Sequence, residues 1–333
     1  MRILQIADGG THLTQTPTPS PGDGQVLIQV AASGVNRADL LQIAGHYPPP
    51  PGEPDHPGLE VAGTIAALGP GVTGWRVGDR VAALLTGGGH ADHALAHASL
   101  LVRTPENLSD VESATLPEAL ATAWSTLVGF GAEVVGGLTP GDDVLILGGS
   151  GGVGTLAIQI ATTAGARVIT TAGGPEKVSA IAGLGAAVVL DHRALSAAEL
   201  TAAVLEATDG RGVDVIFDVL GGGALGENVK RLASKGRLLL IGTQAGSRGE
   251  LDVLTLMQRR ASILGTTLRT RPLAEKAAIM LDVTRHVMPH VAAGRIRPVL
   301  QEAFPADQAA EAFDRMRSGA GIGKLVITWG SQQ

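Results

Sequence analysis

The chain has 333 residues, of which 44% are hydrophobic, so it can bury the core of one large domain or two ordinary ones. Only 17% of the residues are charged and the formal net charge is -6, which excludes the basic field that draws in nucleic acids or anionic membranes. The sequence contains no cysteine, which excludes disulfides, thiolate zinc sites and a cysteine nucleophile. Because we find neither signal-peptide features nor an apolar run of roughly 20 residues, we expect a cytoplasmic protein.

The N-terminal part of the chain predicts a partly antiparallel β domain. Short β-type runs at Val26–Ala31, Val61–Leu68 and Arg80–Leu84 alternate with glycine and proline turns. The proline-rich segment His46–Pro57 predicts a restrained loop, because proline lacks the N–H that helices and interior strands require. The apolar stretch Leu116–Phe130 then predicts a helix leading into a second domain.

From Asp143 onward the pattern changes to alternating strands and helices. Five continuous apolar runs are typical of strands buried on both faces of a parallel sheet: Val144–Leu147, Arg167–Thr171, Ala187–Leu190, Val213–Val219 and Arg237–Ile241. Helical stretches between them predict a doubly wound α/β fold. The chain then predicts a helical segment at Leu273–Ala293, an extended segment at Pro298–Phe304, an acidic helix and a last strand at Lys324–Thr328.

A glycine-rich turn after the first of these strands predicts a dinucleotide site. Gly149, Gly151 and Gly154 fill the glycine positions of G-x-G-x-x-G, which serve the tight turn, the approach to the pyrophosphate and close helix packing. A tight strand-to-helix turn without a ligand is the alternative, but the flanking strand and helix stand on the required sides. The residues expected to bind the cofactor here are Gly149, Ser150, Gly151, Gly152, Val153 and Gly154.

The end of the next strand favours NADPH over NADH. An acidic residue there would bind the ribose hydroxyls of NAD, but the sequence reads Thr-Ala-Gly-Gly and ends at Gly174. Lys177 follows on the next helix, and His192 and Arg193 follow the third strand, which places cations near a 2′-phosphate. The alternative is that these are ordinary solvated surface charges.

Four motifs spread along the chain point to a known family. They are GVNRADL at Gly34–Leu40, GHYPPPPG at Gly45–Gly52, GLEVAG at Gly58–Gly63 and the glycine turn, and the likeness continues to GIGKLV at Gly321–Val326. Together they resemble zinc-free quinone oxidoreductases of the medium-chain dehydrogenase/reductase superfamily. The chain is most similar to the tumour-suppressor-inducible NADPH:quinone oxidoreductase group and less similar to zeta-crystallin.

The resemblance implies two domains and a homodimer. Residues 1–117 and 269–333 would form a catalytic GroES-like domain, and residues 118–268 a Rossmann domain. The segment Leu251–Thr267 would lie near the edge of the Rossmann sheet, available for pairing between two subunits.

The resemblance also bears on metal binding. Zinc alcohol dehydrogenases of the same superfamily carry cysteine where this chain has Asn36 and histidine where it has Leu59, so two ligands are missing. The four-cysteine zinc lobe is missing too. His90, His93 and His97 could suggest another metal site, but His90 would face away from the other two on a strand. We therefore expect no metal and assign these histidines to a surface strand.

Several active-site roles are implied by the resemblance. Asn36 and Asp39 would lie at the nicotinamide end of the cleft, with Thr122 facing the cofactor. Tyr47, the only tyrosine, would line the acceptor site and stack on a quinone or donate its hydroxyl, unless it only packs the loop. Further cofactor contacts would come from Gly242, Thr243, Leu268, Arg269 and Lys324. For Arg269 and Arg271 the sequence does not distinguish ligand contact from surface charge.

A site without a metal suits acceptors whose reduced form is a stabilised anion. Reduction of a simple ketone produces an alkoxide that needs a metal or a positioned acid. Hydride addition to a quinone gives a phenolate-like anion, whose conjugate acid should have a pKa of about 10. We therefore predict NADPH-dependent reduction of quinones, in particular ortho-quinones, by direct hydride transfer. The alternatives are an enone or enoyl-thioester reductase and, in another class, a non-catalytic NADPH-binding structural or RNA-binding protein.

Overall fold

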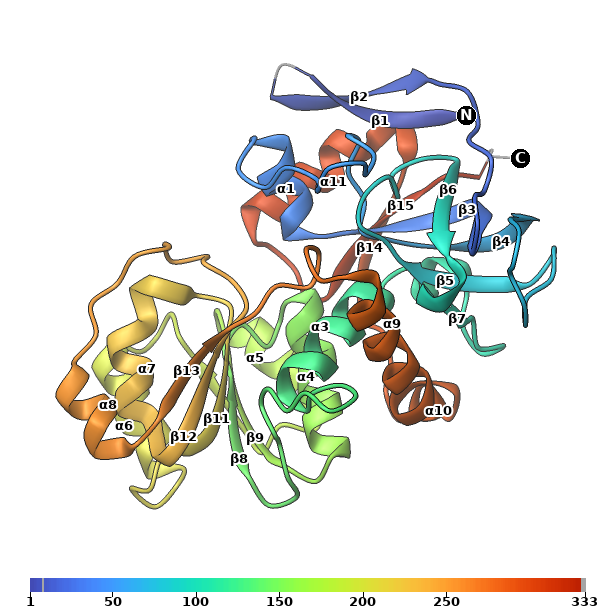
Figure 1. The fold of residues 1–333 in the computed structure, drawn as a ribbon. Helices are drawn as coiled ribbons and strands as arrows, with labels where there is room; N and C mark the ends of the chain where they lie inside the picture. The colour runs from blue at the N-terminus through green and yellow to red at the C-terminus, as the bar shows by residue number, and fades with distance from the viewer. Residues whose placement is uncertain (8, 331–333) are drawn as a thin grey trace. The chain divides into compact units, whose positions relative to one another are not determined.

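The computed structural model describes residues 1–7 and 9–330, which form two compact units (Figure 1). Unit 1 comprises Met1–Ala121 and the chain from Arg269 onward, and unit 2 comprises Thr122–Leu268. The first boundary therefore falls inside helix α3 (Pro117–Leu127), whereas the sequence predicted it at residue 117. Within the described residues no helix has the length and apolar character needed to span a membrane.

Unit 1 is built on a seven-stranded sheet in which only one pair of strands is parallel. The order is β14-β15-β3-β4-β5-β7, and β6 pairs with β3. The parallel pair is β14 with β15, so the predicted partly antiparallel domain is confirmed. The strands are β3 (Gln25–Val35), β4 (Glu60–Leu68), β5 (Arg80–Leu84), β6 (His93–His97), β7 (Leu101–Arg103), β14 (Leu300–Pro305) and β15 (Lys324–Thr328).

A separate antiparallel hairpin and several helices complete unit 1. The hairpin joins β1 (Arg2–Ala7) to β2 (Gly10–Gln15) and was not predicted. The predicted helical segment near residues 273–293 is a helix with a π-helical turn at Val283–Val287. The helices are α1 (Arg37–Ile43), α2 (Asp110–Ser113), α3, α9 (Leu273–Asp282), α10 (Met288–Ala292) and α11 (Ala309–Ser318).

Unit 2 is a parallel six-stranded sheet with helices on both sides (Figure 1). The order β10-β9-β8-β11-β12-β13 is the Rossmann order, and all five predicted strands are present. The strands are β8 (Asp143–Ile146), β9 (Arg167–Ala172), β10 (Val188–Asp191), β11 (Val213–Asp218), β12 (Leu232–Leu240) and β13 (Ser262–Gly265). The helices are α4 (Gly152–Thr163), α5 (Pro175–Ala182), α6 (Ala197–Glu206), α7 (Leu225–Arg231) and α8 (Val253–Arg259).

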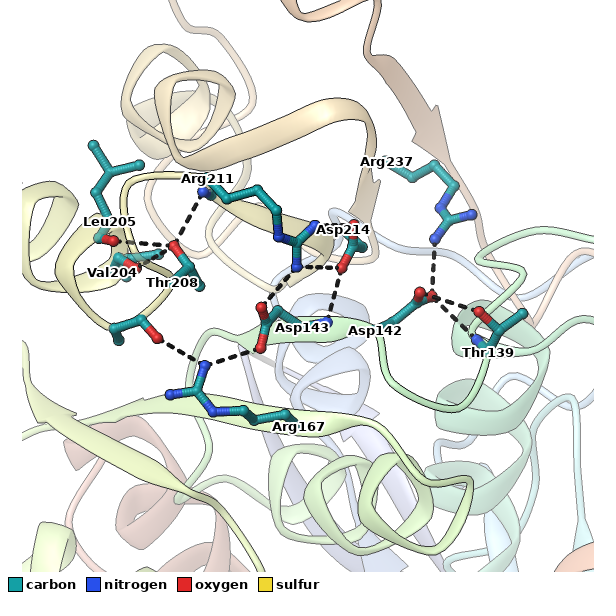
Figure 2. Close-up of polar contacts among 12 residues, drawn as sticks. Thr139, Asp142, Asp143, Arg167, Val204, Leu205, Thr208, Arg211, Asp214 and Arg237 are labelled. Atoms are coloured by element: carbon teal, nitrogen blue, oxygen red, sulfur yellow. Dashed lines mark hydrogen bonds and ion pairs between the residues drawn. The ribbon is translucent and has the colours of Figure 1, made fainter.

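A network of ion pairs joins the amino ends of the strands in unit 2 (Figure 2). Asp143 accepts hydrogen bonds from Arg167 at 3.0 Å and from Arg211 at 2.7 Å. Arg211 also binds Asp214 at 2.6 Å, and the N–H of Asp143 donates to Asp214 at 2.9 Å. Burial would raise the pKa of Asp214, but the hydrogen bonds from Arg211 and from the backbone hold it below its usual value. At this edge of the sheet, each of these carboxylates is therefore paired with at least one arginine.

Candidate functional site

The glycine turn of unit 2 is packed so tightly that two of its glycines admit no side chain. A Cβ on Gly149 would lie 2.0 Å from Thr170 Oγ1, and one on Gly154 would lie 2.2 Å from the oxygen of Gly148. A Cβ on Gly151 would meet only that same oxygen, at 3.4 Å. The first and third glycines thus close the turn against the sheet, while the second leaves its outer side open for a ligand.

The N-terminus of α4 supplies donors next to this turn. Gly151 is the N-cap residue, no side chain caps the helix, and Ser150, Gly152 and Val153 complete the turn. The first N–H groups of a helix have no acceptor within the helix, and together with the helix dipole they favour an anion. The turn therefore fits the pyrophosphate of a dinucleotide.

Three basic side chains gather over the turn that follows β9. A Cβ on Gly173 would meet Arg193 Nε at 3.0 Å and His192 Nε2 at 3.1 Å, so both side chains lie against this glycine. Lys177 stands in the first turn of α5, after Gly174 with its φ of 93°. Burial and the positive charge of Arg193 lower the pKa of Lys177, and burial lowers that of His192. Basic residues that follow two different strands thus form one cluster.

The acidic residue that precedes His192 is engaged by backbone N–H groups. Asp191, at the end of β10, accepts hydrogen bonds from the N–H of Gly174 at 2.8 Å and from the N–H of Arg193 at 2.9 Å. These bonds lower the pKa of Asp191. The carboxylate therefore shapes the turn, and no acid stands at the end of β9, where one would bind the ribose of NAD.

Three further candidate residues lie in unit 2: Gly242 and Thr243 follow β12, and Thr122 is the first residue of the unit. A Cβ on Gly242 would lie 2.8 Å from the oxygen of Val219, so this position also requires glycine, and Thr243 beside it is exposed. Thr122 is half-buried on α3. Since β12 and β8 are both parallel strands of the sheet, Gly242 and Thr243 lie at the same sheet edge as the glycine turn.

Unit 1 contains a buried polar group centred on Lys324. Its ammonium lies 2.5 Å from Glu60 Oε1, 2.6 Å from Asn36 Oδ1 and 3.1 Å from the oxygen of Val35. Asn36 also donates to Glu60 Oε1 at 2.9 Å, and all these side chains are less than a tenth exposed. The three donors of Lys324 thus have acceptors inside unit 1, and the cofactor contact implied for it remains a prediction.

Asp39 is fully buried and ordered by three contacts. It accepts from the N–H of Asn36 at 2.7 Å and from the N–H of Gly58 at 3.1 Å, and His90 Nε2 lies 3.3 Å away. His90 bonds Ser33 at 2.8 Å through its other nitrogen and is 0% exposed. The prediction that His90 lies on a surface strand is therefore wrong: it precedes β6, and buried polar partners hold it inside.

The residues present do not fit a catalytic zinc ion. Leu59 is an apolar, buried side chain, and the oxygens of Asn36 and Glu60 bind the Lys324 ammonium. Across residues 1–7 and 9–330 no three His, Asp or Glu side chains are grouped as metal ligands.

Tyr47 is half-buried and lies beside a guanidinium. The carbon Cζ of Arg269 lies 5.2 Å from the centre of the Tyr47 ring, and Arg269 donates a hydrogen bond to the Tyr47 main-chain oxygen at 3.0 Å. Burial and the negative charge of Glu118 raise the pKa of Tyr47, while Arg269 opposes them. The phenol therefore keeps its proton at neutral pH and remains a hydrogen-bond donor.

Arg269 and Arg271, which the sequence did not distinguish, have different partners in the structure. Arg269 is 4% exposed and also donates to the oxygen of Thr86 at 2.7 Å and to Gln42 Oε1 at 2.8 Å, directly after the buried Leu268. Arg271 forms an ion pair with Glu275 at 2.8 Å, one helical turn along. Arg269 thus belongs to the surroundings of Tyr47, and the cofactor contact that the resemblance implies for it stays a prediction.

Glu118 is a site residue that the sequence pattern did not reveal. Its N–H, at the start of α3, donates to Glu60 Oε2 at 3.0 Å. Burial and the charge of Glu60 raise the pKa of Glu118 to about 8, although Lys324 acts in the opposite sense. A lone carboxylate near the start of the apolar stretch Leu116–Phe130 was the one signal in the sequence.

Comparison with known families identifies both parts of the chain. Residues 22–106 match the alcohol dehydrogenase GroES-like domain, and residues 152–283 match the zinc-binding dehydrogenase domain. Human quinone oxidoreductase is 31% identical over 338 residues, covering 98% of this chain and 97% of the human protein. A phenolphthiocerol/phthiocerol polyketide synthase from Mycobacterium tuberculosis is 36% identical over 92% of this chain, which spans only 14% of that relative's length.

Solved structures agree along nearly the whole chain. A mycobacterial protein complexed with NADPH has a TM-score of 0.86 and 28% identity, covering 98% of this chain and 100% of the other. The CurK enoyl reductase has a TM-score of 0.84 and 26% identity, covering 98% of each chain. The predicted fold class, a GroES-like domain with a Rossmann domain, is confirmed. The chain belongs to the medium-chain dehydrogenase/reductase superfamily and has its NAD(P)-binding fold.

Proposed function

We propose that this protein reduces quinones, in particular ortho-quinones, with NADPH, by direct hydride transfer and without a metal. The observation that carries the proposal is Tyr47: a half-buried phenol, the only one in the chain, kept protonated and fixed beside Arg269. The likeness to human quinone oxidoreductase over nearly the full length of both chains supports the same acceptor class.

The cofactor half of the proposal rests on unit 2. The turn from Gly149 to Gly154 would hold the pyrophosphate, and Lys177, His192 and Arg193 would bind the 2′-phosphate that distinguishes NADPH from NADH. Bound NADPH supplies the hydride, that is, two electrons and one hydrogen nucleus. A quinone that takes up this hydride and one further proton becomes the hydroquinone, which balances the reaction.

The acceptor half rests on unit 1. The reduced quinone carries its charge on an oxygen of phenolate type, and a protonated phenol is a suitable hydrogen-bond donor to it because the two have similar acidity. We propose that Tyr47 donates this bond, with Asn36 and Asp39 ordering the loop before α1. Asn36 and Asp39 form a capping box at the start of that helix, which fixes the backbone there.

Anaerobic oxidation of NADPH against a panel of ortho- and para-quinones, with NADH as the control, tests the proposal. We expect turnover of ortho-quinones with NADPH and much weaker turnover with NADH. Tyr47→Phe should lower kcat/KM about tenfold or more, because one charge-assisted hydrogen bond is worth about 1.5–3 kcal/mol. Full quinone turnover by both Tyr47→Phe and Tyr47→Ala would contradict the role of the phenol.

A second candidate is reduction of enones or enoyl thioesters. It is favoured by the structural likeness to the CurK enoyl reductase and by the sequence likeness to a polyketide synthase. The enolate formed from a conjugated carbonyl is stabilised in the same way as the quinone anion. Parallel kinetics on a quinone, an enone and a crotonyl thioester separate the two, and retention of NADPH without oxidation by any of them would instead indicate a non-catalytic NADPH-binding protein.

We further propose that the protein is a cytoplasmic homodimer that pairs through unit 2. β13 is the end strand of the sheet, and α8 beside it exposes three large apolar side chains: Val253 at 57%, Leu254 at 62% and Met257 at 67%. A second copy of the chain would cover them. Met257→Glu should shift the sedimentation equilibrium toward monomer, and a wild-type protein that sediments as a monomer would contradict the dimer.

A further inference from the structure

We propose that Arg269 is a positioning residue of the acceptor site, which holds Tyr47 through its main-chain oxygen and its ring face and acts against the opposing charge of Glu118. The proposal rests on the proposed function, since it takes Tyr47 as the residue that meets the acceptor. It adds two residues to that site, and neither has a role there that sequence pattern alone revealed.

The guanidinium of Arg269 joins three segments that are far apart in the sequence. Its Nε donates to Thr86, its Nη2 to Gln42 on α1, and its Nη1 to Tyr47, which lies 222 residues away along the chain. Gln42 in turn donates from Nε2 to the oxygen of Asp55 at 2.8 Å. The proline-rich loop is thus fixed at Tyr47 directly and at Asp55 through Gln42, so Arg269 determines where the phenol stands.

The charge of Arg269 is not cancelled by these partners. All three acceptors are neutral, namely two main-chain oxygens and one amide, and Arg269 is only 4% exposed. Burial lowers the pKa of Arg269, and the nearby negative charges act in the other direction. Burying a cation is costly, and the electron-rich face of Tyr47 offers partial compensation. A buried guanidinium over a phenol also favours the phenolate, which makes Tyr47 a better donor.

Glu118 acts on the same phenol with the opposite sign. The ionisable groups that act on Glu118 are Asp39 on α1, Glu60 on β4, Lys276 on α9 and Lys324 on β15, and Glu118 in turn acts on Arg269 and Tyr47. Since the pKa of Glu118 is about 8, it is mostly protonated at pH 7 and mostly charged at pH 9. Near neutrality the effect of Arg269 on Tyr47 therefore prevails, and above pH 8 the two charges oppose each other.

The single tyrosine makes a direct test possible without substrate. The ultraviolet absorbance of tyrosinate, followed through an alkaline titration of the native protein, reports Tyr47 alone, because the chain has no other tyrosine. We expect Arg269→Met to raise the pKa of Tyr47 and Glu118→Gln to lower it. Arg271→Met is the matched control, since it removes an arginine that pairs with Glu275 instead. It should leave the titration unchanged.

A double-mutant cycle on quinone turnover then links position to catalysis. We expect Arg269→Met to lower kcat/KM about tenfold or more, because small displacements of an orienting group carry penalties of that size. In a Tyr47→Phe background the same change should have much less effect. An unmoved tyrosine titration in both Arg269→Met and Glu118→Gln, or effects that simply multiply with Tyr47→Phe, would overturn the proposal.

The tyrosine titration and the quinone assay test different claims, so a negative result in one does not decide the other. If no quinone is reduced by the wild-type protein, the proposed function is wrong, while the titration still reports whether Arg269 and Glu118 act on Tyr47. If Arg269→Met does not fold, Glu118→Gln carries the test, because the amide has the shape of the protonated acid that is present at pH 7. A titration that Glu118→Gln fails to lower would then count against the proposal.

Discussion

The two edges of the sheet in unit 2 carry charge in opposite ways. At the amino ends of the strands, Asp143 and Asp214 are paired with Arg167 and Arg211 (Figure 2). At the carboxyl ends, the basic side chains Lys177, His192 and Arg193 are brought together, and the carboxylate of Asp191 is engaged by the backbone. Paired charges stabilise the fold by themselves, whereas like charges held together lower the stability until an anion binds. The charges at the amino ends of the strands therefore stabilise the fold, and those at the carboxyl ends are placed to bind an anionic ligand.

Removing charge at the carboxyl edge should produce the largest effect. The double variant Lys177→Ala/Arg193→Ala is expected to weaken NADPH binding about 100-fold, because charge-assisted hydrogen bonds to a phosphate are worth about 1.5–3 kcal/mol each. NADH, which lacks the 2′-phosphate, should bind as before. Dissociation constants from nicotinamide fluorescence check this, with Arg167→Ala at the opposite edge as the control. Equal weakening of both cofactors would show that the cluster does not read the phosphate.

Removing charge at the amino edge should change stability and leave binding alone. Asp143→Asn breaks two ion pairs of a buried carboxylate and is expected to lower the free energy of unfolding by about 2 kcal/mol. Urea denaturation measures the loss, and NADPH affinity measured in the folded protein should be the same as in the wild type. If Asp143→Asn weakened NADPH binding as much as Lys177→Ala/Arg193→Ala does, the two edges would not differ in function.

The pH dependence of cofactor binding should come from the carboxyl edge. Burial lowers the pKa of His192, so in the free protein this side chain is neutral at pH 7. A phosphate beside it favours the charged form, so binding takes up a proton and NADPH affinity should rise severalfold, by less than about tenfold, as the pH falls from about 8 to about 5.5. His192→Gln should flatten this rise. Protonation of the phosphate itself affects the wild type and His192→Gln equally, so the difference between their pH profiles reports His192.

The smallest effect should be a gain in stability. The pKa of Lys177 is lowered by burial and by Arg193, so the fold disfavours its charged form. Lys177→Met is therefore expected to raise the stability of the cofactor-free protein by a few tenths of a kcal/mol, since the side chain is largely solvated. The gain should disappear when NADPH is present. Thermal unfolding with and without cofactor measures it, and a lower melting temperature without cofactor would contradict repulsion at this edge.

The elements that the sequence predicted correctly are those whose pattern lies within one short segment of the chain. The strands of unit 2 are continuous apolar runs, and the glycine turn between β8 and α4 needs no information from elsewhere in the chain. The β1–β2 hairpin and β13 escaped prediction, because they are short and mostly half-exposed, so their residues show little contrast between faces.

The parts that were missed or wrong depend on contacts between distant residues. His90 was assigned to the surface by strand alternation, but its partner Ser33 is 57 residues away. Arg269 meets Tyr47 across 222 residues, and Glu118 has its pKa raised by groups on other elements. The family resemblance pointed to Tyr47, the only tyrosine, on the proline-rich loop, but the charges that act on it become visible only in the folded chain.

The position of β15 in the unit 1 sheet has a consequence for biosynthesis. This strand pairs with β3, and its Lys324 bonds Asn36 across 288 residues, while the whole Rossmann unit is contiguous in between. On the ribosome the Rossmann unit can therefore fold as soon as it emerges, but the second half of β3 lacks its partner β15 until that later strand is made, while β6 already pairs with the first half. Nascent chains stalled before residue 324 should depend on chaperones for that unpaired half of β3, and the Asn36 side chain acquires its cationic partner only after Lys324 has been made.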